Sequence, residues 1–235
     1  MNDTIIVPLD FPALEPALQL VDQLGEEATF FKVGLELFTA AGPKAIRALR
    51  ERGKDVFLDL KYHDIPNTVA GAVGQAAPLG VRFLTVHATG GAEMMKAAVD
   101  AAEGRVTVLA VTVLTSMDAG NLEAIWDRRV PVVSQEVVRL ANLARTAEVG
   151  GIVCSPQEVG AVAEIMADGT ELVTPGIRFA GGAVHDQKRI ATPASAISAG
   201  ATRLVIGRAV TQASDPAAAF RRALAEVQSS LVGTP

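Results

Sequence analysis

Short apolar runs alternate along the chain with longer segments in which apolar residues recur every three or four positions. The runs are rich in β-branched and aromatic residues and are apolar almost throughout, which is typical of parallel strands covered on both faces. The longer segments have the periodicity of amphipathic helices, and a glycine often closes them. The pattern predicts strands at 4–9, 29–34, 55–61, 82–88, 106–113, 150–154, 171–176 and 203–207, and helices that include 13–25, 43–53 and 134–150.

Eight repeats of strand and helix predict a closed (β/α)₈ barrel, formed by a single domain over residues 1–235. An open, doubly wound sheet is the alternative, but such sheets usually have fewer strands and a glycine-rich first turn. Here the first turn, residues 9–12, reads LDFP. Pro8 removes a hydrogen-bond donor from the first strand, which is tolerable at the strand's last residues.

Composition and charge narrow the classes of function. The 235 residues are 49% hydrophobic and carry a net charge of −5, so no basic surface for nucleic acid or an anionic membrane is expected. The one cysteine, Cys154, excludes an internal disulfide and suits a reducing compartment. No apolar run approaches the roughly 20 residues of a membrane helix, and the N-terminus is too short and acidic for a signal peptide. We expect a soluble, cytoplasmic protein.

Chemistry in such a barrel lies where the strands end and the following loops begin. Polar and charged side chains stand at nearly every one of those ends, although only 20% of the chain is charged. They are Asp10, Lys32, Asp59, Lys61, His87, Thr115, Ser155, Arg178 and Arg208. This concentration of charge at one end of the barrel is difficult to explain by structure alone.

The third strand ends on a group of three charged residues, in the stretch FLDLKYHDIPNTV at 57–69. Asp59 and Lys61 are two positions apart and therefore point to the same face of an extended strand, the barrel mouth. Asp64 follows the strand, just before a proline that favours an extended backbone. We expect Asn67 or Thr68 to start the next helix.

A lysine between carboxylates stays protonated at neutral pH, because each anion favours the ammonium form. Lys61 would then be a proton donor, and a fixed cation beside a developing carbanion. Asp59 would repel a substrate carboxylate and favour its departure as CO₂. No site for an organic electron sink is evident, so decarboxylation would depend on preorganised charges. The alternative is an internal ion pair that closes the barrel, although desolvation makes such pairs weak sources of stability.

The stretch at 57–69 resembles the signature of the orotidine 5′-phosphate decarboxylase family, bacterial type. Shorter matches follow in the same order along nearly the whole chain. They are 9-LDF-11, 31-FKVG-34, 86-VHATGG-91, 111-VTVLTS-116, 153-VCS-155, 174-TPGIR-178, 186-DQKR-189 and 205-VIGRAVT-211. The resemblance implies conversion of orotidine 5′-phosphate (OMP) to UMP and CO₂ in pyrimidine biosynthesis, without a metal or other cofactor.

The resemblance also implies a role for each charged residue. Lys61 would protonate C6 of the pyrimidine, and Asp59 would lie against the departing carboxylate. Asp64 would reach into the site of a partner subunit, so that Lys32, Asp59, Lys61 and the partner's Asp64 form an alternating series. Thr68 would cross the same interface towards the ribose. The active enzyme would be a homodimer with two shared sites.

Further ligand contacts follow from the resemblance. Asp10 and Lys32 would bind ribose hydroxyls, and Thr115 would hydrogen-bond the pyrimidine, with Ser116 as its neighbouring competitor. His87 is interpreted as structural, and His63 as a residue that positions its loop.

The loops after strands seven and eight are the usual phosphate site of this barrel. Gly207 would let the backbone approach an oxygen, and Arg208 would bind it. The stretch 179–191 is expected to form a lid, with Gln187 reaching the phosphate and pyrimidine, His185 solvated, and Arg178 contacting the ligand at the strand end.

Two other functions remain open. A related branch, the keto-gulonate phosphate decarboxylase and hexulose phosphate synthase type, shares the Asp-x-Lys-x-x-Asp motif but uses Mg²⁺, held partly by an acidic residue at the end of strand two. That position is Lys32 here, and Glu36 is expected in the following helix. The other alternative is a non-catalytic nucleotide-binding barrel, which the presence of both Asp59 and Lys61 disfavours.

Overall fold

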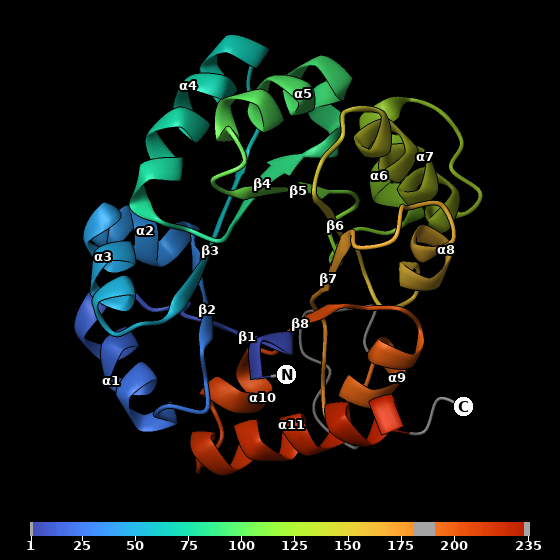
Figure 1. Ribbon diagram of the computed structural model, residues 1–235. Coiled ribbons are helices and arrows are strands. Elements are labelled where there is room, and N and C mark those ends of the chain that lie inside the picture. Colours follow the sequence, from blue (N-terminus) through green and yellow to red (C-terminus); the bar gives the residue numbers. More distant parts are fainter. Residues whose placement is uncertain (1, 181–190, 233–235) are drawn as a thin grey trace.

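A computed structural model describes residues 2–180 and 191–232 (Figure 1). Eight parallel strands pair in sequence order and close into a barrel, because β8 also pairs with β1. The strands are β1 (Ile5–Pro8), β2 (Phe30–Gly34), β3 (Asp55–Tyr62), β4 (Phe83–His87), β5 (Thr107–Val111), β6 (Gly151–Val153), β7 (Glu171–Thr174) and β8 (Arg203–Val205). Each lies within or close to the predicted apolar run, so the predicted (β/α)₈ fold is confirmed.

Helices form an outer ring around the barrel (Figure 1). They are α1 (Leu14–Leu24), α2 (Leu35–Ala41), α3 (Pro43–Glu51), α4 (Pro66–Ala76), α5 (Gly91–Ala102), α6 (Ala119–Trp126), α7 (Val133–Thr146), α8 (Val159–Ala163), α9 (Pro193–Ser198), α10 (Arg208–Thr211) and α11 (Pro216–Val232). Three short 3₁₀ helices are η1 (Asn2–Thr4), η2 (Ala77–Leu79) and η3 (Ala88–Gly90). No helix within these two ranges is long and apolar enough to cross a membrane.

Two helix ends differ from the prediction. Helix α7 ends at Thr146 rather than at residue 150, because Glu148 adopts a left-handed φ of 58° that a helix cannot continue. Helix α4 begins at Pro66, with Ile65 as its N-cap, rather than at Asn67 or Thr68. Proline suits the first helical position, since its missing N–H is not needed there.

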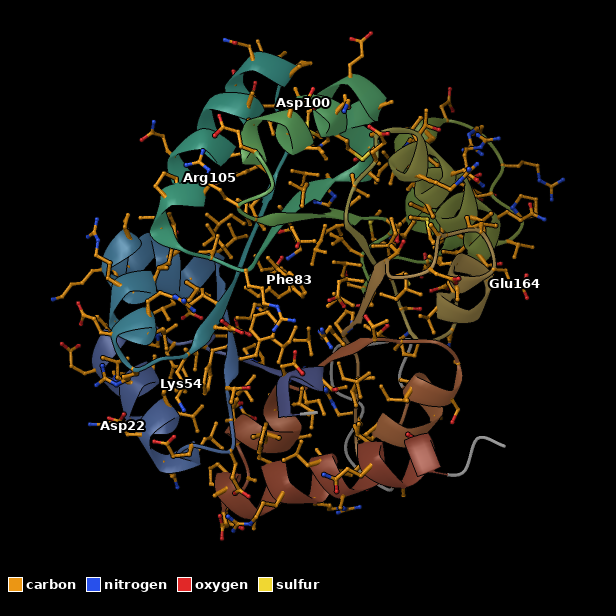
Figure 2. The ribbon with its side chains drawn as sticks, viewed as in Figure 1. Asp22, Lys54, Phe83, Asp100, Arg105 and Glu164 are labelled. Carbon is orange, nitrogen blue, oxygen red and sulfur yellow. The ribbon has the colours of Figure 1, made fainter. Side chains whose placement is uncertain are left out.

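The strands bury both of their faces, which explains the continuous apolar runs. An inner cluster fills the barrel, and Figure 2 shows one of its members, Phe83, inside the ring of strands. The cluster consists of Ile6, Phe30, Phe57, Phe83, Leu109, Val173 and Val205. The alternate strand residues pack outwards against the helices; Leu58 and Leu84 are examples. Each fully buried side chain of this size stabilises the fold by about 1.5–3 kcal/mol relative to its exposed state.

A network of ion pairs closes the barrel at the amino ends of the strands. The Arg82 guanidinium lies over two phenylalanine rings of the inner cluster, 5.1 and 5.4 Å from their centroids. It also pairs with Asp3 and Asp55, at 3.0 and 3.1 Å. Arg203 pairs with Glu171 at 2.9 Å and with Asp3 at 3.5 Å. Ion pairs therefore close the barrel at the end opposite to Asp59 and Lys61. The pair formed by Asp59 and Lys61 at the mouth is not needed for that closure.

Candidate active site

Asp59 and Lys61 meet on the inner side of strand β3 at the barrel mouth. Lys61 Nζ donates a hydrogen bond of 2.8 Å to Asp59 Oδ1. The strand is irregular here, since its register with β4 shifts between Leu58 and Tyr62 and Lys61 has a left-handed φ of 51°. The backbone thus departs from the regular strand assumed from the sequence, although the two side chains still come together. A non-glycine residue in this conformation is uncommon, and such residues cluster at functional sites.

Four side chains of alternating charge, Asp10, Lys32, Asp59 and Lys61, form a series that we call the charged row. Lys32 Nζ lies 3.2 Å from Asp10 Oδ1 and 3.5 Å from Asp59 Oδ2. Asp59 therefore contacts an ammonium group on each side. The Asp59 residue is only 8% exposed, whereas the Asp10 side chain at the other end of the row is 60% exposed.

The charged row keeps Asp59 ionised. Burial raises the pKa of Asp59, but the ammonium groups of Lys32 and Lys61, with hydrogen bonds from Lys61 and Thr85, outweigh burial and hold this pKa below its usual value. Asp59 is consequently a buried negative charge at neutral pH, fixed in position by its cationic neighbours.

Thr85 of strand β4 supports this arrangement, and the sequence analysis did not identify it. Its hydroxyl group donates to Asp59 Oδ1 at 2.9 Å and accepts a hydrogen bond from the Lys61 backbone N–H at 2.9 Å. The residue is fully buried. Its sequence signal is a polar residue two positions after Phe83, on the inward face of an otherwise apolar strand. Such a hydroxyl can fix the orientation of the carboxylate.

Gly34 at the end of β2 is a second residue that sequence reasoning missed. A Cβ atom at this position would lie 2.8 Å from Lys32 Nζ and 3.1 Å from Asp10 Oδ1. A side chain here would therefore displace the contact between Asp10 and Lys32. The signal was the short spacing Lys-x-Gly at a strand end, which is too common to be informative by itself.

Two adjoining cavities open at the mouth. The smaller, of about 170 Å³, is mainly apolar apart from Lys32, Asp59, Lys61 and Thr115. Its lining residues are Lys32, Phe57, Asp59, Lys61, Val111, Val113, Leu114, Thr115, Val153, Cys154, Pro175 and Val205. The larger, of about 340 Å³, is lined by Pro8, Asp10, Lys32, Pro175, Gly176, Arg178, Val205, Gly207, Arg208, Thr211 and Gln212. The two cavities share Lys32, Pro175 and Val205, so they suit one elongated ligand with an apolar end and an anionic end.

Two arginines line the larger cavity. Arg178 is 7% exposed; its Nη1 donates to the Ile177 carbonyl at 2.7 Å, and its buried Nε has no hydrogen-bond partner among the described residues. Burial, and then the nearby charge of Arg208, lower the pKa of Arg178. Two guanidinium groups on one cavity wall are suited to bind an anion with several oxygens.

Asp64 and Thr68 are not brought to the charged row of their own chain. Both are exposed, and Asp64 Oδ1 accepts a hydrogen bond of 2.7 Å from the Ile65 N–H. Residues 63–68 are all exposed, including Ile65 at 67%. Gln187 and His185 lie outside the described residues.

The Lys32 ammonium group occupies the part of the charged row where a divalent metal ion would have to bind the carboxylates. The Lys32 ammonium lies between the carboxylates of Asp10 and Asp59, and Glu36, in the first turn of α2, takes no part in the row. Within residues 2–180 and 191–232, no group of three or more His, Cys, Asp or Glu side chains could hold a metal ion. The donor set of the row does not fit Mg²⁺, which prefers several oxygen ligands.

Comparison with known proteins places the chain in a family. Residues 3–223 match the sequence model of the Orotidine 5′-phosphate decarboxylase / HUMPS family. The chain belongs to this family. Its resemblance to orotidine 5′-phosphate decarboxylases, predicted from the signature at 57–69, is thereby confirmed.

Two curated members of the orotidine 5′-phosphate decarboxylase family illustrate how close the similarity is. The protein named orotidine 5′-phosphate decarboxylase from Halorhodospira halophila is 52% identical over 229 residues, covering 96% of each chain. The protein named orotidine 5′-phosphate decarboxylase from Anaeromyxobacter sp. strain K is 54% identical over 220 residues, covering 94% of this chain and 96% of the other. The crystal structure of orotidine 5′-phosphate decarboxylase from Lactobacillus acidophilus is 39% identical, with a TM-score of 0.85 over 96% of this chain and 99% of that one.

Proposed function

We propose that the chain is an orotidine 5′-phosphate decarboxylase, a carboxy-lyase that converts OMP to UMP and CO₂ in pyrimidine biosynthesis. The observation that carries the proposal is the buried carboxylate of Asp59 between two ammonium groups, in an apolar cavity that continues into a site with two arginines. An apolar ring with a carboxylate would enter the first cavity, and a phosphate the second. We further propose that the whole chain acts as one catalytic domain in the cytoplasm, where its single cysteine would stay reduced.

The charged row supplies the chemistry. The substrate carboxylate would lie against Asp59, and repulsion between the two anions would favour loss of CO₂. When the bond from C6 to the carboxylate breaks, its electron pair remains on C6. The Lys61 ammonium group would stabilise this negative charge and then transfer a proton to C6, and it would recover a proton from solvent after product release. The groups are oriented before the reaction, so little reorganisation is needed as charge develops.

The rest of the ligand would be held away from the reacting carbon. Arg178, Arg208 and the backbone at Gly207 would bind the phosphate, with Gln187 joining them. Asp10 and Lys32 would contact the ribose hydroxyls, and Thr115 the pyrimidine. Binding energy from these distant contacts can then contribute to catalysis at C6.

We also propose that the active form is a homodimer with shared sites. Lys61 contacts Asp59 within its chain, while Asp64, three residues further on, is exposed and accepts a hydrogen bond from the Ile65 N–H. A run of six exposed residues with a largely exposed isoleucine suits a surface that a second copy covers. Asp64 and Thr68 would then complete the partner's site.

Arg208→Ala should lower kcat/KM for OMP by about 10- to 100-fold, since a hydrogen bond to a charged group contributes about 1.5–3 kcal/mol. Turnover of orotidine, which lacks the phosphate, should change little. Steady-state kinetics on both substrates measure the effect, and Arg47→Ala on the exposed side of α3 is the control. Equal losses on both substrates would place the phosphate site elsewhere.

Sharing of the site predicts that two inactive variants restore each other. A dimer of one Lys61→Ala chain and one Asp64→Ala chain contains one wholly intact site, so about half of the wild-type activity per dimer is expected. Co-expression with two different affinity tags isolates the mixed dimer for assay. Absence of any rescue, with the mixed dimer present, would contradict a shared site.

The proposed activity is tested by adding the purified chain to OMP and following the loss of pyrimidine absorbance together with formation of UMP. Conversion at catalytic chain concentrations is expected. Binding of UMP without any conversion of OMP would instead support a non-catalytic nucleotide-binding barrel.

A further inference from the structure

The segment between Lys61 and Asp64 must set the distance between two reaction centres if the site is shared as proposed. Lys61 serves the site of its own chain, and Asp64 serves the site of the partner. Only two residues, Tyr62 and His63, separate them. An error of about 1 Å in the position of a catalytic group can cost about 100-fold in rate. The segment therefore needs firm support on the side that carries Asp64.

The structure shows how each neighbour of Asp64 is held. Tyr62 pairs with Val86 of β4 and packs against the outer core. On the other side, Ile65 is extended, with φ −60° and ψ 152°, ahead of Pro66 at the start of α4. Between these two residues, the exposed His63 side chain places its ring beside that of His87.

His63 lies against the end of strand β4 and the turn that follows it. Its ring centroid is 5.5 Å from that of His87, with an angle of 43° between the ring planes. Its Cδ2 atom is 3.2 Å from the position that a Cβ atom on Gly90 would occupy. The absence of a side chain at Gly90 therefore leaves room first for the Met94 side chain, which lies closest to that position, and also for the His63 ring.

His87 is held at the end of strand β4. It is half-buried, and its backbone is in register with Val111 of β5. Burial, His63 and Lys61 lower the pKa of His87, whereas Asp59 raises it to a smaller extent, so the imidazole is uncharged at neutral pH. The His63 ring therefore lies beside an uncharged His87 ring.

We propose that His63 is a positioning residue that acts in trans. Seated on His87 and Gly90, it fixes the Asp64 carboxylate for the site of the partner copy, and the site that contains its own Lys61 does not depend on it. This inference rests on the proposed shared site, and it adds to that site a residue that contacts neither the substrate nor the charged row.

Removing the ring should impair catalysis without unfolding the chain. His63→Ala is expected to lower kcat by about 10- to 100-fold, with little change in melting temperature because the residue is exposed. His63→Phe keeps a ring that can pack on His87 and Gly90, and it should retain most of the activity. Equal losses in the two variants would contradict a packing role.

Two mixed dimers distinguish action in trans from action in cis. The first joins a His63→Ala chain to a Lys61→Ala chain. If His63 acts in trans, the site containing the intact Lys61 receives an undisturbed Asp64, and about half of the wild-type activity per dimer is expected. If His63 acts on its own Lys61, this dimer stays as weak as the His63→Ala homodimer.

The second mixed dimer joins a wild-type chain to a chain carrying both His63→Ala and Lys61→Ala. Action in trans predicts weak activity, because the one site with an intact Lys61 receives the disturbed Asp64. Action in cis predicts the reverse, about half of the wild-type activity per dimer. A weak result in both dimers would mean that the substitution damages the fold generally, and would also overturn the proposal.

Failure of the underlying proposals gives a different result. If the Lys61→Ala and Asp64→Ala mixture shows no rescue while the wild type decarboxylates OMP, the shared site is wrong, and positioning in trans is wrong with it. If the wild type does not decarboxylate OMP, the proposed activity itself fails.

Discussion

Lys61→Ala is expected to abolish turnover of OMP while leaving UMP binding largely intact. The change removes both the proton donor and the cation next to the developing carbanion. General acid catalysis alone contributes about 10²- to 10⁴-fold, so a loss of at least 10³-fold in kcat is a conservative expectation. The residues proposed to bind the phosphate are Arg178 and Arg208, so we expect the affinity for UMP to be retained.

The measurement pairs kcat for OMP with the dissociation constant for UMP. Lys44→Ala, on the exposed surface of α3, is the matched control and should change neither value. Wild-type turnover in the Lys61→Ala protein would remove the proposed mechanism. Loss of both UMP binding and turnover would show that Lys61 is needed for ligand binding, and not only as a proton donor.

Asp59→Asn is the second substitution with a large expected effect. The amide has nearly the same shape and can still accept a hydrogen bond from Thr85, but it carries no charge to repel the substrate carboxylate. It also leaves Lys32 and Lys61 without the anion that lies between them. We expect kcat to fall by about 10²- to 10³-fold, as for the loss of one preorganised electrostatic contact. An unchanged kcat would contradict a role for this charge.

Asp59→Asn should also change how the free energy of unfolding depends on pH. The pKa of Asp59 is lowered in the folded state, so ionisation stabilises the fold at pH values above the unfolded pKa, about 3.9. This contribution is lost as the pH falls through the lower, folded pKa. The free energy of unfolding of the wild type, relative to Asp59→Asn, should therefore be greater at pH 7 than at pH 3. Denaturant unfolding of both proteins at the two pH values measures it, and a pH-independent difference would contradict the assignment.

The strands and the barrel were predictable from sequence, because both faces of each strand are buried and its apolar run is continuous. Phe57 and Leu58, for example, enter the inner and outer clusters on opposite sides of one strand. The helix boundaries were less predictable. Glu148 has a left-handed backbone conformation that ends α7. Because this residue is neither glycine nor proline, the sequence gives no signal for the helix end at this point.

The site was predictable only in part. The spacing of Asp59 and Lys61 indicated that they share a face, whereas the left-handed conformation of Lys61 depends on tertiary contacts with Thr85. Thr85 acts through Asp59 and Lys61 on another strand, at a separation that a local pattern does not encode. Gly34 lies two residues from Lys32 on the same strand, but its role also depends on Asp10, which follows β1. Asp64 is exposed on its own chain, and its proposed contacts lie on a second copy, so a local pattern in one chain does not determine them.

The sign of the charge at position 32 is the feature by which we expect to distinguish a metal-free decarboxylase from a Mg²⁺-dependent one. A carboxylate at this point would add an oxygen ligand of the kind that Mg²⁺ prefers, whereas the Lys32 ammonium pairs with both Asp10 and Asp59. We therefore propose that fixed side-chain charges, with no metal ion, stabilise the charge formed during decarboxylation.

Turnover of OMP in the presence of excess chelator tests this claim most directly. The purified chain is dialysed against chelator and assayed for UMP formation with and without added Mg²⁺. We predict the same kcat in both assays. Loss of turnover in chelator, with recovery on addition of Mg²⁺, would contradict the account.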